Sequence, residues 1–143
     1  MKKILFLAVG LAFMSAGAHA NVTGKWLTKG AKSHVEIEKC GAKLCGKITW
    51  LKEPNSTSGA PVVDSKNEDE KERGRPILGL PLLKDFEPTD DPNYWVNGKI
   101  YNPEDGKIYS CEMTLQDDGQ LKVRGYVGVP MFGESQFWKR VKE

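Results

Sequence analysis

The chain has little histidine, and this scarcity excludes several kinds of site. Only two histidines occur among the 143 residues. His19 falls within an N-terminal segment typical of an export signal, so a processed chain would keep His34 alone. One imidazole cannot form a site with several histidine ligands, and no pair of carboxylates has the spacing of an acid–base pair. We therefore expect a protein that is not an enzyme, with no catalytic residues, no cofactor and no metal.

A long apolar run is also absent. The apolar run from Ile4 to Phe13 is too short for a bilayer, which needs roughly 20 residues. Two lysines precede it, and Ala18-His19-Ala20 supplies a small-x-small cleavage site. We predict a cleaved signal peptide at 1–20, a single domain at 21–143 with no transmembrane segment, and a periplasmic or secreted location.

The chain lacks a strong excess of either charge. It has 21 Lys and Arg against 19 Asp and Glu, and two of the lysines lie in the predicted signal peptide. The predicted domain is therefore formally neutral, and no basic stripe interleaved with aromatic residues remains to follow a phosphate backbone. Nucleic acid is not an expected partner.

Helical periodicity is missing as well, whereas short segments of period two are frequent. The expected strands are 23–29, 33–40, 44–51, 77–84, 94–96, 99–101, 108–116, 120–127 and 134–141. The residues Asn97-Gly98 between two of them form either a tight turn or, as we favour, a bulge within one strand. This pattern predicts an all-β fold, a small antiparallel up-and-down barrel that is closed or nearly closed.

The first predicted hairpin contains Cys40 and Cys45. Placing these two residues opposite each other brings both apolar sets to one face, and an exported protein can form the disulfide. The predicted pairs are Glu38–Lys47, Ile37–Ile48, Glu36–Thr49 and Val35–Trp50. A redox pair and a metal site are the alternatives, but the first usually has two intervening residues and the second needs further ligands.

The second predicted hairpin turns at Asp117-Asp118-Gly119. A three-residue connection gives the pairs Leu115–Leu121, Met113–Val123, Glu112–Arg124, Cys111–Gly125 and Tyr109–Val127. This register points Cys111 inward. The thiol is then either an inert buried group or part of a ligand cavity, since Gly125 leaves room beside it.

The segment 53–75 is polar and breaks the β pattern. A capping-box pattern, Ser65 followed by Glu68, predicts a short helix over 66–73. The segment is either a lid or binding loop, or simply mobile. Its carboxylates lack the spacing of a calcium loop, so we interpret them as a solvated charge run: Asp64, Glu68, Asp69, Glu70 and Glu72.

Motifs at both ends of the chain resemble known families. Gly24-Lys25-Trp26 and Trp138-Lys139-Arg140 resemble the calycins, the superfamily of lipocalins and avidins. The resemblance implies that Trp26 plugs one barrel end and that Arg140 packs across it, a structural role.

The whole predicted domain is similar to the bacterial family called domain of unknown function 2147. The similarity rests on Gly24 and Trp26, Cys40 and Cys45 with Leu44 and Gly46, Trp50, Arg75-Pro76-Ile77 with Gly79, Gly98-Lys99-Ile100-Tyr101 with Pro103 and Gly106, Arg124-Gly125-Tyr126, and Trp138 with Arg140. It implies an exported, lipocalin-like barrel, while the family name assigns no activity. Cys111 is not part of this pattern.

Two functions fit these features. The first is a non-catalytic carrier or sensor that binds a small apolar ligand inside the barrel. Its candidate lining residues are Val35, Ile37, Ile48, Trp50, Tyr109, Cys111, Met113, Val123 and Val127; the alternative for each is a solid core. The second is an envelope module with a filled barrel that binds a protein partner through the 53–75 loop and surface aromatics such as Tyr94 or Trp95.

Overall fold

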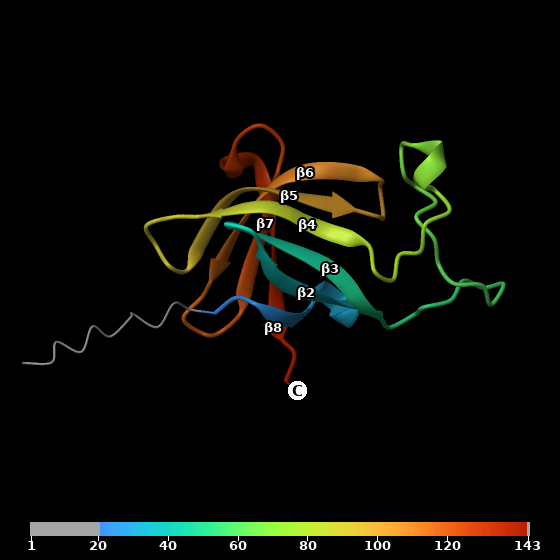
Figure 1. Cartoon of the computed structure of the whole chain (residues 1–143), viewed down its shortest axis with the longest axis horizontal. Coiled ribbons are helices and arrows are strands. Elements are labelled where there is room, and N and C mark those ends of the chain that lie inside the picture. The colour runs from blue at the N-terminus through green and yellow to red at the C-terminus, as the bar shows by residue number, and fades with distance from the viewer. Residues whose placement is uncertain (1–20, 143) are drawn as a thin grey trace, which may run out of the picture.

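The computed structural model describes residues 21–142, and the predicted signal peptide lies outside them. Its eight antiparallel strands form a closed barrel in which each strand pairs with the next and β8 pairs with β1 (Figure 1). The strands are β1 Gly24–Leu27, β2 Ser33–Cys40, β3 Lys43–Leu51, β4 Pro81–Pro88, β5 Tyr94–Asn102, β6 Lys107–Leu115, β7 Leu121–Tyr126 and β8 Gly133–Arg140. Short 3-10 helices are η1 Lys29–Ala31, η2 Glu70–Glu72 and η3 Pro130–Phe132. The predicted all-β barrel is confirmed.

The barrel has two ends, the termini end and the loop end. The termini end holds segments 21–23 and 141–142 together with the β2–β3, β4–β5 and β6–β7 connections. The loop end holds the long 52–80 segment and the β5–β6 and β7–β8 connections. In Figure 1 the long segment, in green, extends away from the barrel and carries η2 at its far side.

The first hairpin has a different register from the predicted one. The chain turns at Gly41 and Ala42, so that Cys40 pairs with Lys43. The observed pairs are Glu38–Cys45, Ile37–Gly46, Glu36–Lys47 and Val35–Ile48, and a bulge then places His34 opposite Trp50. The shift is two residues, and side chains alternate with a period of two, so every residue up to the bulge keeps its predicted face. Two-residue hairpin turns are the commonest kind, a preference that the predicted register ignored.

The second hairpin and the β5 bulge follow the prediction. Leu115 pairs with Leu121, Met113 with Val123 and Cys111 with Gly125. Strand β7 ends at Tyr126, so the predicted Tyr109–Val127 pair is not formed. The register of β5 against β6 shifts between Trp95 and Gly98, as a bulge requires.

Two predicted elements are corrected. The strand expected at 77–84 lies at Pro81–Pro88, and residues 77–80 still belong to the long segment. The helix expected over 66–73 is reduced to η2, and its N-cap is Asp69, which accepts from the Lys71 backbone N–H at 3.0 Å. Asn67 is instead held in a turn by Asp64, whose backbone oxygen accepts its N–H at 3.1 Å.

Candidate functional site

At the termini end Arg140 packs on Trp26, as the calycin resemblance implies. The two residues are neighbours across β1 and β8, and the guanidinium carbon lies 4.3 Å from the centroid of the fully buried indole. Arg140 also donates to the backbone oxygens of Thr23 and Asn21, and the indole N–H donates to the Val22 oxygen at 2.8 Å. These contacts tie residues 21–23 across the barrel end.

Most of the candidate lining residues lie in the packed core. Val35, Cys111 and Met113 are completely buried, and the other interior positions are nearly so: Ile37, Ile48 and Val123. They pack with large side chains of the same cluster, including Trp26, Phe86 and Trp138. The barrel interior is therefore filled by the chain's own side chains, and a ligand-lining role for these six residues stays a prediction.

Three candidate lining residues lie elsewhere. Trp50 is 41% exposed, because the bulge in β2–β3 turns it outward, where its ring lies 4.5 Å from that of His34. Val127 is 72% exposed, because it follows the last residue of β7. These two predictions are wrong. Tyr109 is half-buried, and its hydroxyl donates to Asp105 near the β5–β6 turn.

The Cys111 side chain is completely buried, and the space that Gly125 leaves on the facing strand would admit a methyl group. A methyl group at Gly125, directly opposite, would meet Ile100 and the Tyr109 Cβ at 3.7 and 3.8 Å, which is ordinary contact. Burial, with a smaller contribution from Glu112, raises the pKa of the thiol to about 12. The inert interpretation therefore fits the surroundings of Cys111.

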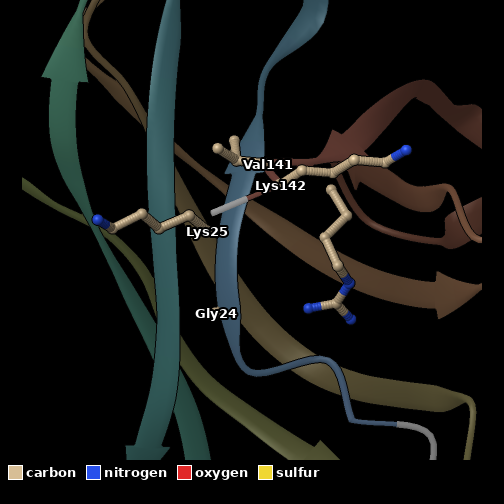
Figure 2. Close-up of a pocket in the computed structure, with 5 residues that line it drawn as sticks. Gly24, Lys25, Val141 and Lys142 are labelled. Carbon is tan, nitrogen blue, oxygen red and sulfur yellow. The ribbon is translucent and has the colours of Figure 1, made fainter.

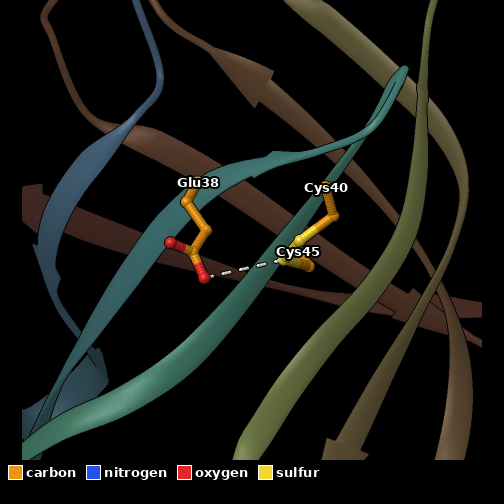
Figure 3. Close-up of side chains that lie close together, drawn as sticks. All are labelled: Glu38, Cys40 and Cys45. Atoms are coloured by element: carbon orange, nitrogen blue, oxygen red, sulfur yellow. Dashed lines mark hydrogen bonds between the residues drawn. A yellow bond between two sulfur atoms is a disulfide. The ribbon is translucent and has the colours of Figure 1, made fainter.

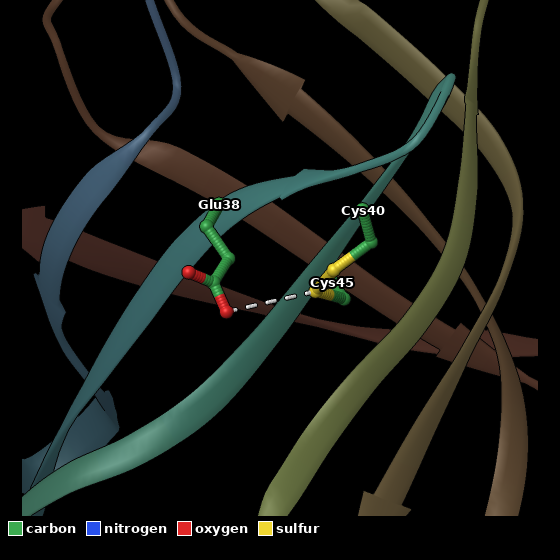
Figure 4. The surroundings of a disulfide bond; sticks show 3 residues. All are labelled: Glu38, Cys40 and Cys45. Atoms are coloured by element: carbon green, nitrogen blue, oxygen red, sulfur yellow. Dashed lines mark hydrogen bonds between the residues drawn. A yellow bond between two sulfur atoms is a disulfide. The ribbon is translucent and has the colours of Figure 1, made fainter.

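Cys40 and Cys45 form the predicted disulfide, with their Cα atoms 5.8 Å apart. The bond lies beside the β2–β3 turn, and the Cys45 sulfur is 4.0 Å from a Glu38 carboxylate oxygen (Figures 3 and 4). Both sulfurs are used by the bond, so neither is a thiolate that could bind a metal. A structural disulfide is typical of proteins outside a reducing cytosol.

A hollow of about 900 Å³ lies at the termini end. It is bounded by segment 21–23, the β2–β3 turn and the β4–β5 loop. Its floor is apolar and buried, with Val22, Leu44 and Trp95 exposed by 8% or less. Its other lining residues are Asn21, Thr23, Lys39, Gly41, Ala42, Lys43, Pro88, Thr89, Asp90, Asp91 and Pro92.

The hollow was not predicted, because Trp95 was expected to be a surface aromatic residue. Trp95 is buried, and Tyr94 is half-buried with its hydroxyl donating to Glu112 at 2.6 Å. The β4–β5 loop is preformed, since the Thr89 hydroxyl donates to the Tyr94 oxygen and the Asn93 N–H to the Asp91 carboxylate, both at 2.9 Å. The run from Pro88 to Pro92, just before Trp95, was the sequence signal that could have indicated the loop beside this hollow.

A second hollow, of about 590 Å³, lies beside the end plug and is lined by Gly24, Lys25, Arg140, Val141 and Lys142. Figure 2 shows the side chains of Lys25 and Lys142 pointing away from each other. Arg140 is already held by Trp26 and by two backbone oxygens. The three cations thus do not converge on one point where an anion could sit.

A buried carboxylate anchors the long segment at the loop end. Asp64 is fully buried and accepts from the Tyr101 hydroxyl at 2.6 Å, the Asn67 amide at 2.8 Å and the Arg75 guanidinium at 2.9 Å. Burial opposes its charge, but these three hydrogen bonds outweigh burial and lower its pKa. Asp64 is therefore not part of a solvated charge run, contrary to the sequence-based interpretation.

The backbone packing of the long segment agrees with this anchor. A Cβ atom at Gly106, in the β5–β6 turn, would lie 1.9 Å from the Lys66 backbone oxygen. The Val63–Pro76 bridge closes the segment on itself. Residues 63–76 are thus fixed to the barrel by Asp64, Tyr101 and Gly106.

Comparisons with known proteins agree with this architecture. A solved structure described as protein HP1028 from the human pathogen Helicobacter pylori, of the lipocalin family, superposes with a TM-score of 0.73 at 24% identity. The alignment covers 86% of this chain and 84% of that chain, so the two share a fold. No curated protein matches the chain. Within residues 21–142, no helix has the length and apolar character needed to cross a membrane.

The family comparison covers nearly the whole barrel. The model of a family described as "Uncharacterized protein conserved in bacteria" matches residues 24–140, from the first residue of β1 to the last of β8. The chain belongs to this family, DUF2147.

Proposed function

We propose that the protein is an exported, non-catalytic binding protein that takes a small, mostly apolar ligand at the termini end of its barrel. The 900 Å³ hollow carries this proposal. Ligand sites combine an apolar floor with a few placed polar groups and often lie in the mouths of β-barrels. Leu44 and Trp95 supply the floor here, and Lys39, Asp90 and Asp91 supply rim charges. The lipocalin-like fold is compatible with small-ligand binding.

The hollow at the termini end, the mouth of the barrel beside the Trp26–Arg140 pair, suits a ligand better than the barrel interior. An interior ligand would have to displace side chains such as Met113 and Phe86, which are fully buried and tightly packed. A ligand at the mouth would meet a floor that exists already and a β4–β5 loop that is already hydrogen-bonded. A preformed site spares the ordering cost of binding.

Three features support a non-catalytic role in an oxidising compartment. His34, the single histidine of residues 21–142, stacks on Trp50 on the outer surface, away from the hollow. The Cys111 thiol is buried, and its raised pKa keeps it protonated at neutral pH. The Cys40–Cys45 disulfide supports a periplasmic or secreted location.

Native mass spectrometry tests the proposal on protein purified from its own envelope fraction, before and after organic extraction. We expect a removable small-molecule adduct on the wild-type protein. Ala42→Trp, at the exposed β2–β3 turn, fills the hollow and should abolish the adduct. Ala60→Trp, at an exposed position outside the hollow, is the matched control and should keep it. A clean wild-type mass, or an adduct that survives Ala42→Trp, contradicts a site at the mouth.

The filled interior favours a second candidate, an envelope module that binds a protein partner. A barrel without internal space needs no ligand to complete its core, and its surface is then the part available for recognition. A clean mass together with a stoichiometric co-purifying protein would favour this second function over the first.

A further inference from the structure

The connection between β7 and β8 exposes an unusual amount of apolar surface. Met131 and Phe132 are each 77% exposed, Val127 is 72% exposed and Val129 is 49% exposed. These four residues belong to one segment of six, the 127–132 loop, which stands away from the barrel at the top of Figure 1. Adjacent exposed apolar residues of this size mark contact with a partner or a membrane.

Several backbone groups of the 127–132 loop are bonded within the protein. The Arg124 guanidinium donates to the Pro130 oxygen at 2.7 Å and to the Met131 oxygen at 3.5 Å. The Phe132 N–H donates to the Val129 oxygen at 3.1 Å, and Pro130 has no N–H. A loop in water does not need these bonds, whereas a loop in a lipid phase does, because each unpaired peptide group there costs several kcal/mol.

The shape and area of the loop argue against a second copy of the chain or a partner strand as its binding partner. A stable dimer of this chain would bury roughly 800 Å² on each copy, more than four side chains on a protruding loop can provide. The 127–132 loop contains no β-strand, so it offers no strand edge of its own with which a partner strand could pair. Shallow insertion into lipid needs neither a large flat surface nor an edge.

We propose that the 127–132 loop inserts Met131 and Phe132 into the interfacial layer of a lipid bilayer. Arg124 lies at the base of the loop, where its charge would meet lipid phosphates while it continues to bind the loop carbonyls. Because the loop belongs to the loop end of the barrel, the 900 Å³ hollow at the termini end would stay open to the aqueous side. The proposal does not depend on what the hollow binds.

Co-sedimentation with vesicles of phosphatidylethanolamine and phosphatidylglycerol tests this insertion. The wild-type chain without its predicted signal peptide should bind. The double variant Met131→Ser/Phe132→Ser should bind at least about tenfold more weakly. Phe137→Ser is the matched control, since Phe137 is a 48% exposed aromatic residue on β8, outside the loop, and its loss should leave binding unchanged. Thermal unfolding would establish that all three proteins are folded.

Insertion depth gives a second measurement. The variant Phe132→Trp should acquire a blue-shifted emission that brominated lipids quench, beyond the response of the wild-type tryptophans. Wild-type protein that stays in the supernatant overturns the proposal, as does equal binding of the folded double variant. Binding of the loop to a protein in place of vesicles would overturn it as well.

Discussion

The hydroxyl of Tyr101 donates a 2.6 Å hydrogen bond to the carboxylate of Asp64, joining strand β5 to a loop residue 37 positions earlier in the chain. Asp64 is fully buried, and Arg75, which also binds it, lies with its guanidinium carbon 5.4 Å from the centroid of the Tyr101 ring. Burial and the bond to Asp64 raise the pKa of Tyr101 to about 12, so the hydroxyl stays a donor across the physiological range. The three residues act as one anchor for the long segment.

Loss of the Asp64 carboxylate should destabilise the protein. Asp64→Ala leaves Tyr101 and Arg75 without their partner, and we expect a loss of about 3 kcal/mol in the free energy of unfolding, measured in urea. Asp90→Ala, at an exposed position, is the control and should change stability little. Amide exchange of residues 64–67 should accelerate in the Asp64 variant. A variant as stable as the wild type would mean that the anchor does not hold the loop.

The same carboxylate should make stability fall in acid. The pKa of Asp64 is lowered in the folded state, so its contribution is fully present above the unfolded pKa of about 3.9 and is lost as pH falls through the folded value. The difference in unfolding free energy between the wild type and Asp64→Asn should therefore be constant above about pH 5 and shrink below about pH 4. A difference that grows in acid would contradict the assigned direction of the pKa shift.

Cys111 should be chemically silent in the native protein. Its thiol is completely buried, and its pKa of about 12 leaves almost no thiolate at neutral pH. Ellman's reagent should label no thiol in native buffer and one thiol per chain in denaturant without reductant, since Cys40 and Cys45 are paired. Cys111→Ala supplies the blank. Rapid labelling of the native wild-type protein would instead show an accessible path to the thiol.

The disulfide should stabilise the folded protein without being required for its folding. Reducing the entropy of the unfolded chain across a loop this short is worth about 2 kcal/mol, so Cys40→Ser/Cys45→Ser should unfold at lower urea concentration with an unchanged far-ultraviolet spectrum. Any ligand binding at the barrel mouth should persist in this variant. Failure of the variant to form a barrel would mean that the bond is required for folding and does more than stabilise it.

The sequence was informative where the turn residues and the apolar pattern together left one register. In the second hairpin a two-residue turn would have placed Met113 against Arg124, so the alternation itself gave the observed pairing of Met113 with Val123. In the first hairpin, registers that differ by two residues keep the same faces, and the assumption that Cys40 and Cys45 lie directly opposite selected the wrong one.

Tertiary contacts account for most of the remaining errors. In the sequence, Asp64 cannot be distinguished from the neighbouring carboxylates, because its partner Tyr101 lies on a strand far along the chain. Whether the barrel interior is filled or hollow depends on how Phe86, Trp26 and Trp138 pack together. Alternation alone gives only the face on which each side chain lies. Val127 was expected to be the last residue of a strand, since it continues the alternation of β7, and residues 128–132 fell in the expected connection to the next strand.

Gly98, in the β5 bulge, should not tolerate a larger side chain. Asn97, its neighbour, has a positive φ of 59°, and a Cβ atom at Gly98 would lie 2.5 Å from the ring of Phe86, which is fully buried. Since the ring is enclosed by the core, it cannot move aside, and Gly98→Ala should cost about 1–3 kcal/mol in unfolding free energy. Gly74→Ala is the matched control, because a Cβ there has no neighbour within 4 Å and the backbone needs no positive φ. The pair Gly98→Ala/Phe86→Leu should be less destabilised than the sum of its two single changes, since the smaller side chain gives the new methyl group room. Additive losses would mean that the strain of the bulge itself, and not the Phe86 ring, requires glycine at this position.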